Sequence, residues 1–198
     1  MKPWADRLDA LLERSLAAAR WLAIAGGALM LVCSFLIVID VLARRLVGIS
    51  TWGADELSYY AMAISASWSL AFALLAKAHI RIDFIRNQLR LPVRVLFDVV
   101  ALCGMSFTSL MFSAATWEIF HRSWQRGTTS ITQFATPLWI PQLLWFAGFA
   151  FFSLMCALLI VRALVALAVQ RSPSAAEELI GVLSVEAESA EAISDLKS

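Results

Sequence analysis

Four apolar stretches, each long enough to cross a lipid bilayer as a helix, constrain this chain more than any other feature. They run at about 21–43, 56–76, 93–117 and 138–164, and none carries a charged residue in its middle third. About 20 apolar residues in a helix match a hydrocarbon core about 30 Å thick. Of the 198 residues, 61% are hydrophobic and 16% are charged, an apolar excess too large for a soluble core of this size. The sequence therefore predicts an all-α integral membrane protein with four transmembrane helices in a bundle.

Lysine and arginine are distributed unevenly among the segments outside these stretches. Basic residues gather before the first stretch, between the second and third, and after the fourth: Lys2, Arg7, Arg14, Arg20, Lys77, Arg81, Arg86, Arg90, Arg94, Arg162 and Arg171. The two other loops hold only Arg44 and Arg45, and Arg122 and Arg126. Because basic loops remain in the cytoplasm, both termini and the middle loop are predicted to be cytoplasmic, and the two short loops to face outward. The first stretch is too long for a signal peptide and is expected to be retained.

The segments that flank the spans have compositions of their own. Residues 1–20 alternate apolar and charged positions at helical spacing, which predicts an amphipathic helix on the inner membrane surface or, alternatively, a solvated extension of the first span. The middle loop, 79–91, has the pattern of a short interfacial helix, and Pro92 then opens the third span. After a membrane domain at 21–170, the acidic tail at 171–198 is expected to be mobile.

Residues that would support catalysis, cofactor binding or ion coupling are missing from the expected membrane interior. A coupled carrier needs carboxylates or unwound helices near the midplane, and a haem between helices needs facing histidines. His79 and His121 are expected on opposite sides of the membrane, and Cys33, Cys103 and Cys156 match no metal or redox spacing. The net charge of +1 argues against a nucleic-acid partner. We therefore expect no catalytic residue, no cofactor and no metal site.

Charged residues near the span ends recur at a spacing of four. The pairs are Asp40 with Arg44, Arg94 with Asp98, and Glu118 with Arg122. Residues four apart lie on one face of a helix, so each pair either neutralises itself there or contributes a charge to another chain.

Small side chains also recur every four residues in the second span, at Ala61, Ser65, Ser69 and Ala73. In lipid, such a ridge lets helix backbones approach closely. The ridge predicts a helix packing interface, either within this chain's own bundle or with a helix of a partner.

Several short runs, in order along residues 40–149, point to a known family. The runs are Asp40-Val41-Leu42-Ala43-Arg44, Trp52-Gly53-Ala54-Asp55-Glu56-Leu57, Lys77-Ala78-His79-Ile80-Arg81-Ile82-Asp83 with Leu91-Pro92 after it, and Pro137-Leu138-Trp139-Ile140-Pro141 with Gly148-Phe149 after it. As an ordered set, they resemble the DctQ-type small membrane subunit of tripartite ATP-independent periplasmic (TRAP) transporters. The chain departs from the family in its second span, where the family often has a glycine near the centre and this chain has Ser67 and Ser69.

The resemblance implies an accessory role in the bacterial inner (cytoplasmic) membrane. Such a multi-pass subunit joins a large membrane transport subunit, which carries substrate and sodium by an elevator-like motion, and a periplasmic substrate-binding protein delivers the substrate. The small subunit would brace the scaffold of the large one, with membrane lipid around both, and would help to dock the binding protein. The resemblance thus predicts a part in sodium-coupled uptake of an organic acid.

Two groups of residues become candidates for these contacts. The expected topology places an outer rim at Arg44, Trp52, Asp55 and Glu56, and a cytoplasmic interfacial motif at Lys77, His79, Arg81 and Asp83. At the start of the second span, Glu56 suits the positive end of the helix dipole. The alternative is that Glu56 pairs with Arg44 across the short loop and so shapes the docking surface.

Two other classes of protein have the same number of spans. A small independent multidrug-type transporter would need a membrane-embedded glutamate in its first span, where this chain has only Asp40, near one end. A free-standing assembly factor would need no large membrane partner. Co-purification with a large membrane subunit separates both alternatives from the accessory subunit.

Overall fold

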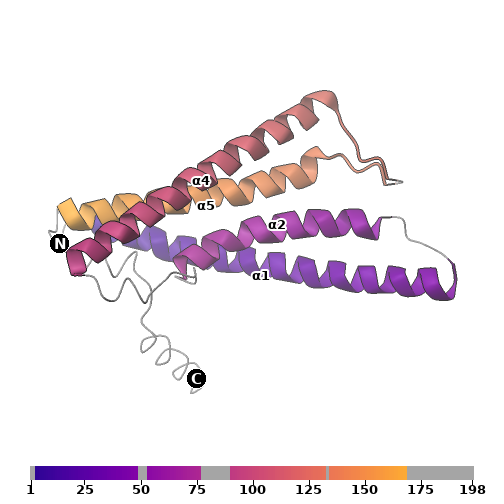
Figure 1. Cartoon of the computed structure of the whole chain (residues 1–198), viewed down its shortest axis with the longest axis horizontal. Helices are drawn as coiled ribbons and strands as arrows, with labels where there is room; N and C mark the ends of the chain where they lie inside the picture. The colour runs from indigo at the N-terminus through magenta and orange to yellow at the C-terminus, as the bar shows by residue number, and fades with distance from the viewer. Residues whose placement is uncertain (1–2, 49–52, 77–89, 133, 169–198) are drawn as a thin grey trace, which may run out of the picture.

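The computed structural model describes residues 3–48, 53–76, 90–132 and 134–168 (Figure 1). These residues form four helices: α1 (Pro3–Leu46), α2 (Ala54–Leu75), α4 (Leu91–Arg126) and α5 (Trp139–Ala168). Each helix is long and apolar enough to cross a membrane. Within the described ranges, β structure is limited to one antiparallel bridge between Thr129 and Pro137. The all-α fold with four membrane-length helices is therefore confirmed.

The boundaries of α4 follow from one proline and one glycine. Pro92 lies in the first turn, as the sequence predicted, where its missing N–H costs no helical hydrogen bond. The helix ends at Gly127, whose φ of 59° is a left-handed conformation that a residue without Cβ adopts readily. With 36 residues, α4 is about 54 Å long and extends well beyond a hydrocarbon core of about 30 Å.

The first helix is continuous from Pro3 to Leu46, without a break at residue 20. The N-terminal segment and the first span therefore share one helix, which corresponds to the extension that the sequence left as an alternative. The other flanking segments, the loop at 79–89 and the tail at 171–198, lie outside the described residues.

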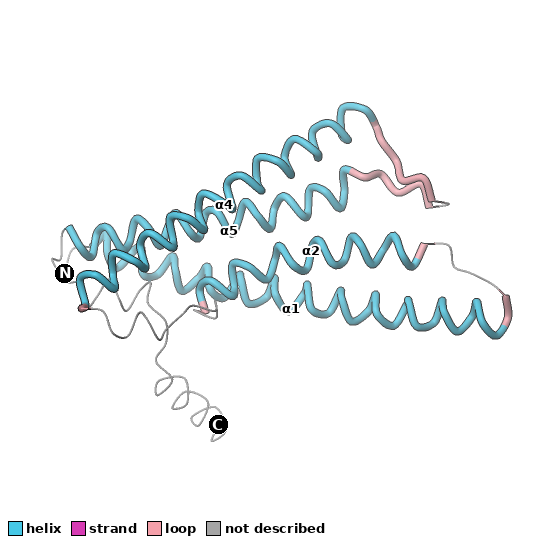
Figure 2. The backbone as a smooth tube through the Cα atoms, in the orientation of Figure 1, coloured by secondary structure: helices cyan, strands magenta, loops and turns pink. Residues whose placement is uncertain are grey.

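The helices are arranged across the molecule in the order α1, α2, α5, α4 (Figures 1 and 2). Neighbouring helices α1 and α2 are antiparallel, as are α4 and α5, whereas α2 and α5 run parallel at the centre. All four converge at the end where α1 and α4 begin. They diverge toward the other end, here called the loop end, which holds the α1–α2 and α4–α5 connections. The loop end is where the predicted outer rim lies.

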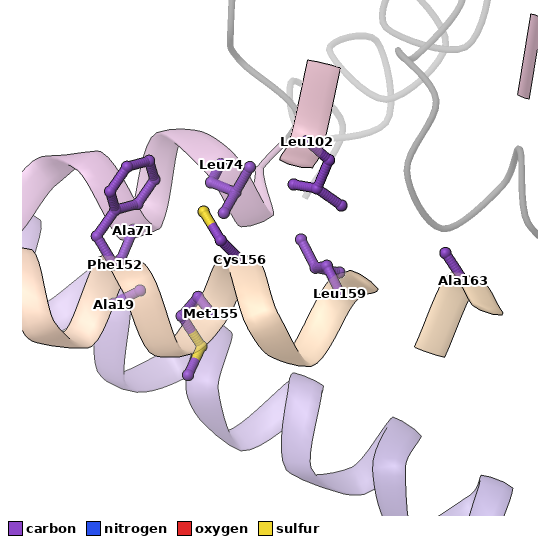
Figure 3. Packing of buried hydrophobic residues seen from close by; sticks show 9 residues of the cluster. All are labelled: Ala19, Ala71, Leu74, Leu102, Phe152, Met155, Cys156, Leu159 and Ala163. Atoms are coloured by element: carbon purple, nitrogen blue, oxygen red, sulfur yellow. The ribbon is translucent and has the colours of Figure 1, made fainter. Parts of the chain in front are cut away.

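The hydrophobic core lies away from the loop end and takes side chains from every helix (Figure 3). Its buried members are Ala19, Ala71, Leu74, Leu102, Phe152, Met155, Cys156, Leu159 and Ala163. Many other large apolar side chains are exposed, including Trp21, Phe35 and Phe107. Exposed apolar surface of this extent suits a lipid environment or a membrane partner, since neither requires burial within the chain.

Candidate functional site

The first turn of α2 carries a buried carboxylate at the loop end. Glu56 is only 8% exposed, whereas its neighbour Asp55 is exposed. The hydroxyl of Tyr60 donates to Glu56 Oε1 at 2.6 Å, and the hydroxyl of Thr132 donates to Glu56 Oε2. Tyr60 lies one turn further along the same helix, but Thr132 belongs to the α4–α5 connection, 76 residues away. The carboxylate therefore joins two parts of the chain that are distant in sequence.

The α4–α5 connection is a short hairpin, residues 128–138. The N–H of Ser130 donates to the carbonyl of Thr136 at 2.9 Å, and the N–H of Leu138 donates to the carbonyl of Thr128 at 3.1 Å. Near its tip, Ala135 has a φ of 43°, a left-handed conformation that is uncommon for a residue with a Cβ. The cross-hairpin hydrogen bonds thus define the shape of this connection.

The hairpin makes a second contact with the start of α2, beside the first. The ring of Phe134 lies where a Cβ on Gly53 would be, so any other residue at position 53 would displace the ring. Ile131, near the tip, is fully exposed. Through Thr132 and Phe134, the hairpin reaches from the end of α4 to the start of α2, as the path of the chain in Figure 2 shows.

Arg44 lies at the loop end, as predicted, but it does not pair with Glu56. Its Nη2 donates to Oδ2 of Asp40 at 2.5 Å, on its own helix, and Asp40 is buried. Among the described residues, no hydrogen bond or ion pair joins Arg44 to Glu56. This part of the rim hypothesis was wrong, whereas the predicted Asp40–Arg44 pair is confirmed.

The register of α1 against α2 explains why that rim pair does not form. Ser65 Oγ donates to the carbonyl of Gly26 at 2.7 Å, and Cys33 Sγ lies 3.8 Å from the carbonyl of Leu57. These two contacts place Glu56 level with a point about nine residues before Arg44 on α1. At 1.5 Å per residue, Arg44 is therefore on the order of 14 Å further along the helix axis.

Several predicted site residues fall where the structure gives no description. Trp52 of the outer rim and the whole cytoplasmic interfacial motif, Lys77, His79, Arg81 and Asp83, lie outside the described residues. Of the rim residues that are described, Arg44 and Asp55 are exposed and Glu56 is buried. Glu56 is therefore unsuited to direct contact with a partner.

The small-residue ridge of α2 does not face a single neighbour. Ala61 is buried, and Ser65 packs against α1, where a Cβ on Gly26 would lie 3.0 Å from Ser65 Cα. Ser69 is exposed and its hydroxyl donates to Ala66 on its own helix, while Ala73 is partly buried. Positions four apart advance by about 40° around an α-helix, so the row turns away from α1 along its length.

Helices α2 and α5 approach each other closely at Gly148 and Ser67, two residues that were not predicted to meet. A Cβ on Gly148 would lie 2.7 Å from Ser67 Cβ and 2.8 Å from Trp68 Cδ1. The indole N–H of Trp68 also donates to the carbonyl of Leu144 at 3.0 Å. The glycine that permits this approach is therefore on α5, opposite Ser67.

A buried row of hydroxyl-bearing residues on α4 was missed by the sequence predictions. The row consists of Ser106, Ser109, Ser113, Thr116 and Ser123. Ser153 of α5 lies within hydrogen-bonding distance of two of them, 2.8 Å from Ser109 and 3.1 Å from Ser113. The signal in the sequence is a spacing of three and four in alternation, which keeps one helix face toward a neighbour better than a spacing of four.

Charged side chains also lie between helices at the opposite end. Asp98 of α4 and Arg162 of α5 are both buried. Val95 and Ala166 pack together one turn away, so the antiparallel register places the two charges at the same level. The predicted Glu118–Arg122 pair is confirmed at 3.5 Å and is exposed. No group of three potential metal ligands occurs among the described residues.

Neither the curated proteins nor the solved structures yield a match to this chain. A family model does match, over residues 33–166, and its description is "Tripartite ATP-independent periplasmic transporters, DctQ component". This match spans more than half of the chain and includes all or part of each of the four helices. The chain therefore belongs to the DctQ component family, the small inner-membrane subunits of tripartite ATP-independent periplasmic transporters.

Proposed function

We propose that this chain braces the static scaffold of the large transport subunit and helps to dock the periplasmic substrate-binding protein, in sodium-coupled uptake of an organic acid. Membership of the DctQ family supports the assignment to such an assembly. The proposal places the loop end in the periplasm, because the α1–α2 and α4–α5 connections there are poorer in lysine and arginine than the other segments outside the spans. The hairpin and Asp55 then belong to the periplasmic surface.

The bracing role is supported by one observation: buried hydroxyls bond helices of this chain to each other, whereas the outer helix faces are apolar and exposed. Buried hydroxyls such as those of Ser109 and Ser153 bind each other and so serve to pack this chain's own helices. The outer faces of α1 and α4 are apolar and exposed, and the apolar part of α1 is the least buried of the four spans. These faces offer a large membrane partner an extensive apolar surface.

Reconstitution in liposomes tests the accessory role. The chain alone should take up no organic acid, and sodium-dependent uptake should appear when the large subunit and the binding protein are added. The large subunit with the binding protein, but without this chain, is the matched control and should be strongly impaired. Sodium-dependent uptake by this chain alone would contradict the proposal.

A further inference from the structure

The loop end needs a specific contact to hold its parts together, because the core lies at the other end of the molecule. The helix pairs α1–α2 and α4–α5 diverge toward the loop end (Figure 1). There the α4–α5 hairpin extends to the start of α2 and meets it at two adjacent points, Thr132 on Glu56 and Phe134 on Gly53. The hairpin thus connects the two helix pairs where they are furthest apart.

Losing the Glu56–Thr132 contact costs more free energy than losing an exposed polar contact, because water does not replace the lost donor at a buried carboxylate. A buried carboxylate is stable only when donors replace the water that it has lost. Tyr60 is one donor, and it moves together with Glu56 because both residues are on α2. Thr132 is the first hairpin donor to the carboxylate, and the hydroxyls of Ser130 and Thr136 in the same hairpin also hydrogen-bond to it. Loss of the Thr132 hydroxyl removes the shortest of these contacts and so weakens the hold of the carboxylate on the hairpin.

The tip of the hairpin carries exposed apolar side chains at the loop end. Trp124, near the end of α4, and Trp139, at the start of α5, pack edge to face with ring centroids 4.8 Å apart. Tryptophan is typical of span ends, and residues 128–138 connect these two ends. The hairpin is rich in hydroxyl side chains, which water solvates, yet it exposes Ile131 completely and Phe134 by more than half. Because the proposed function puts the loop end on the periplasmic side, these exposed apolar side chains are available to a periplasmic protein.

We propose that Glu56 is a positioning residue: through Thr132 it holds the α4–α5 hairpin on the start of α2, and so presents Ile131 and Phe134 to the periplasmic substrate-binding protein. The choice of partner rests on the proposed function, because the binding protein is the soluble component of a tripartite transporter. Glu56 itself does not touch that partner. Its effect on docking acts through the position of the hairpin.

The first experiment measures the position of the hairpin in the full chain, without any partner. Spin labels are attached at Ile131→Cys and Ala28→Cys, both exposed positions, in a Cys103→Ser background in lipid nanodiscs. Thr132→Val keeps the shape of the side chain but removes the hydroxyl, and Thr132→Ser keeps the hydroxyl. The distance distribution should be narrow in the parent and in Thr132→Ser, and broad in Thr132→Val. An equally narrow distribution in Thr132→Val would overturn the positioning role.

The second experiment measures docking in the reconstituted three-component transporter, with native Ile131 and Cys103. The binding-protein concentration that gives half-maximal uptake should rise on the order of tenfold in Thr132→Val, as expected for loss of a hydrogen bond to a charged group. The maximal rate should change little, and Thr132→Ser should behave like the parent. Ile131→Ser should raise the half-maximal concentration in the same direction.

The spin-label distance tests the position of the hairpin, and the half-maximal binding-protein concentration tests docking, so the two proposals can fail separately. A broad distance distribution with an unchanged half-maximal concentration would overturn the docking part of the inference. So would an effect that depends on lipid composition and not on the binding protein, because the tip would then contact lipid. If the parent complex shows no uptake at all, the proposed function fails, while the distance measurement still decides whether Glu56 positions the hairpin.

Discussion

The position of Glu56 was predictable from the sequence, but its hydrogen-bond partner Thr132 was not. Its position in the first turn of a span follows from the sequence, and a carboxylate there suits the helix dipole. Its burial and its bond to Thr132 depend on a hairpin 76 residues away. The predicted partner, Arg44, instead neutralises the buried Asp40 on its own helix. The spacing of four makes the second contact local, and therefore predictable.

Two glycines in the helices provide a prediction at the same scale. Gly148→Ala should destabilise the fold by about 1–3 kcal/mol, because the new methyl group would overlap Ser67 and Trp68 in a packed contact. Gly104→Ala is the matched control, since a Cβ there meets no atom within 4 Å. Equilibrium unfolding in mixed micelles measures both. Equal stability of the two variants would show that α2 and α5 separate easily at Gly148.

At the scale of helices, hydroxyl and small side chains set the contacts. Ser65 and Gly26 bring α1 and α2 together, Ser67 and Gly148 bring α2 and α5 together, and a row of serines on α4 meets Ser153 of α5. Lipid tails are as apolar as leucine, so close packing and hydrogen bonds between helices distinguish one face from another.

The ridge on α2 divides into two halves that substitution can separate. Ser65→Leu should weaken the α1–α2 contact by about 1–3 kcal/mol, because Ser65 lies against the backbone of Gly26. Ser69→Leu should leave the isolated chain as stable as the parent, since Ser69 is exposed. Unfolding of the isolated chain and co-purification with the large subunit are measured for both variants.

The co-purification result then tests whether the ridge packs on a helix of a partner. If Ser69→Leu alone abolishes co-purification while stability is unchanged, the exposed half of the ridge contacts the large subunit. If the isolated Ser65→Leu variant is as stable as the parent, the Gly26–Ser65 contact does not hold α1 on α2.

On the scale of the whole molecule, the four helices form an open arrangement with α2 and α5 at its centre and α1 and α4 at its edges. The apolar part of α5 is the most buried of the spans, and that of α1 the least. A chain that buries so little of its apolar surface internally is well suited to function beside a larger membrane protein.

Topology is the prediction that concerns the entire chain. Reporter fusions after Ser172 should give a cytoplasmic signal, and fusions beside Arg126, in the loop end, should give a periplasmic signal, because basic segments remain inside. Insertion of the same reporter beside Arg90 is the control for the cytoplasmic side. A periplasmic signal at Ser172 would invert the orientation, and the hairpin would then be unable to reach a periplasmic partner.

The sequence alone determined the number and type of the spans, the place of Pro92 in the first turn of α4 and the Asp40–Arg44 pair. Each of these depends on hydropathy or on spacing within one helix, which are local properties of the chain. Only the tertiary structure decided the order α1, α2, α5, α4, the contact of Gly148 with Ser67 and the bond from Thr132 to Glu56. The physical reason is that lipid accepts any apolar helix face equally well. The choice of neighbour therefore depends on small side chains and hydrogen bonds that meet only when distant segments come together.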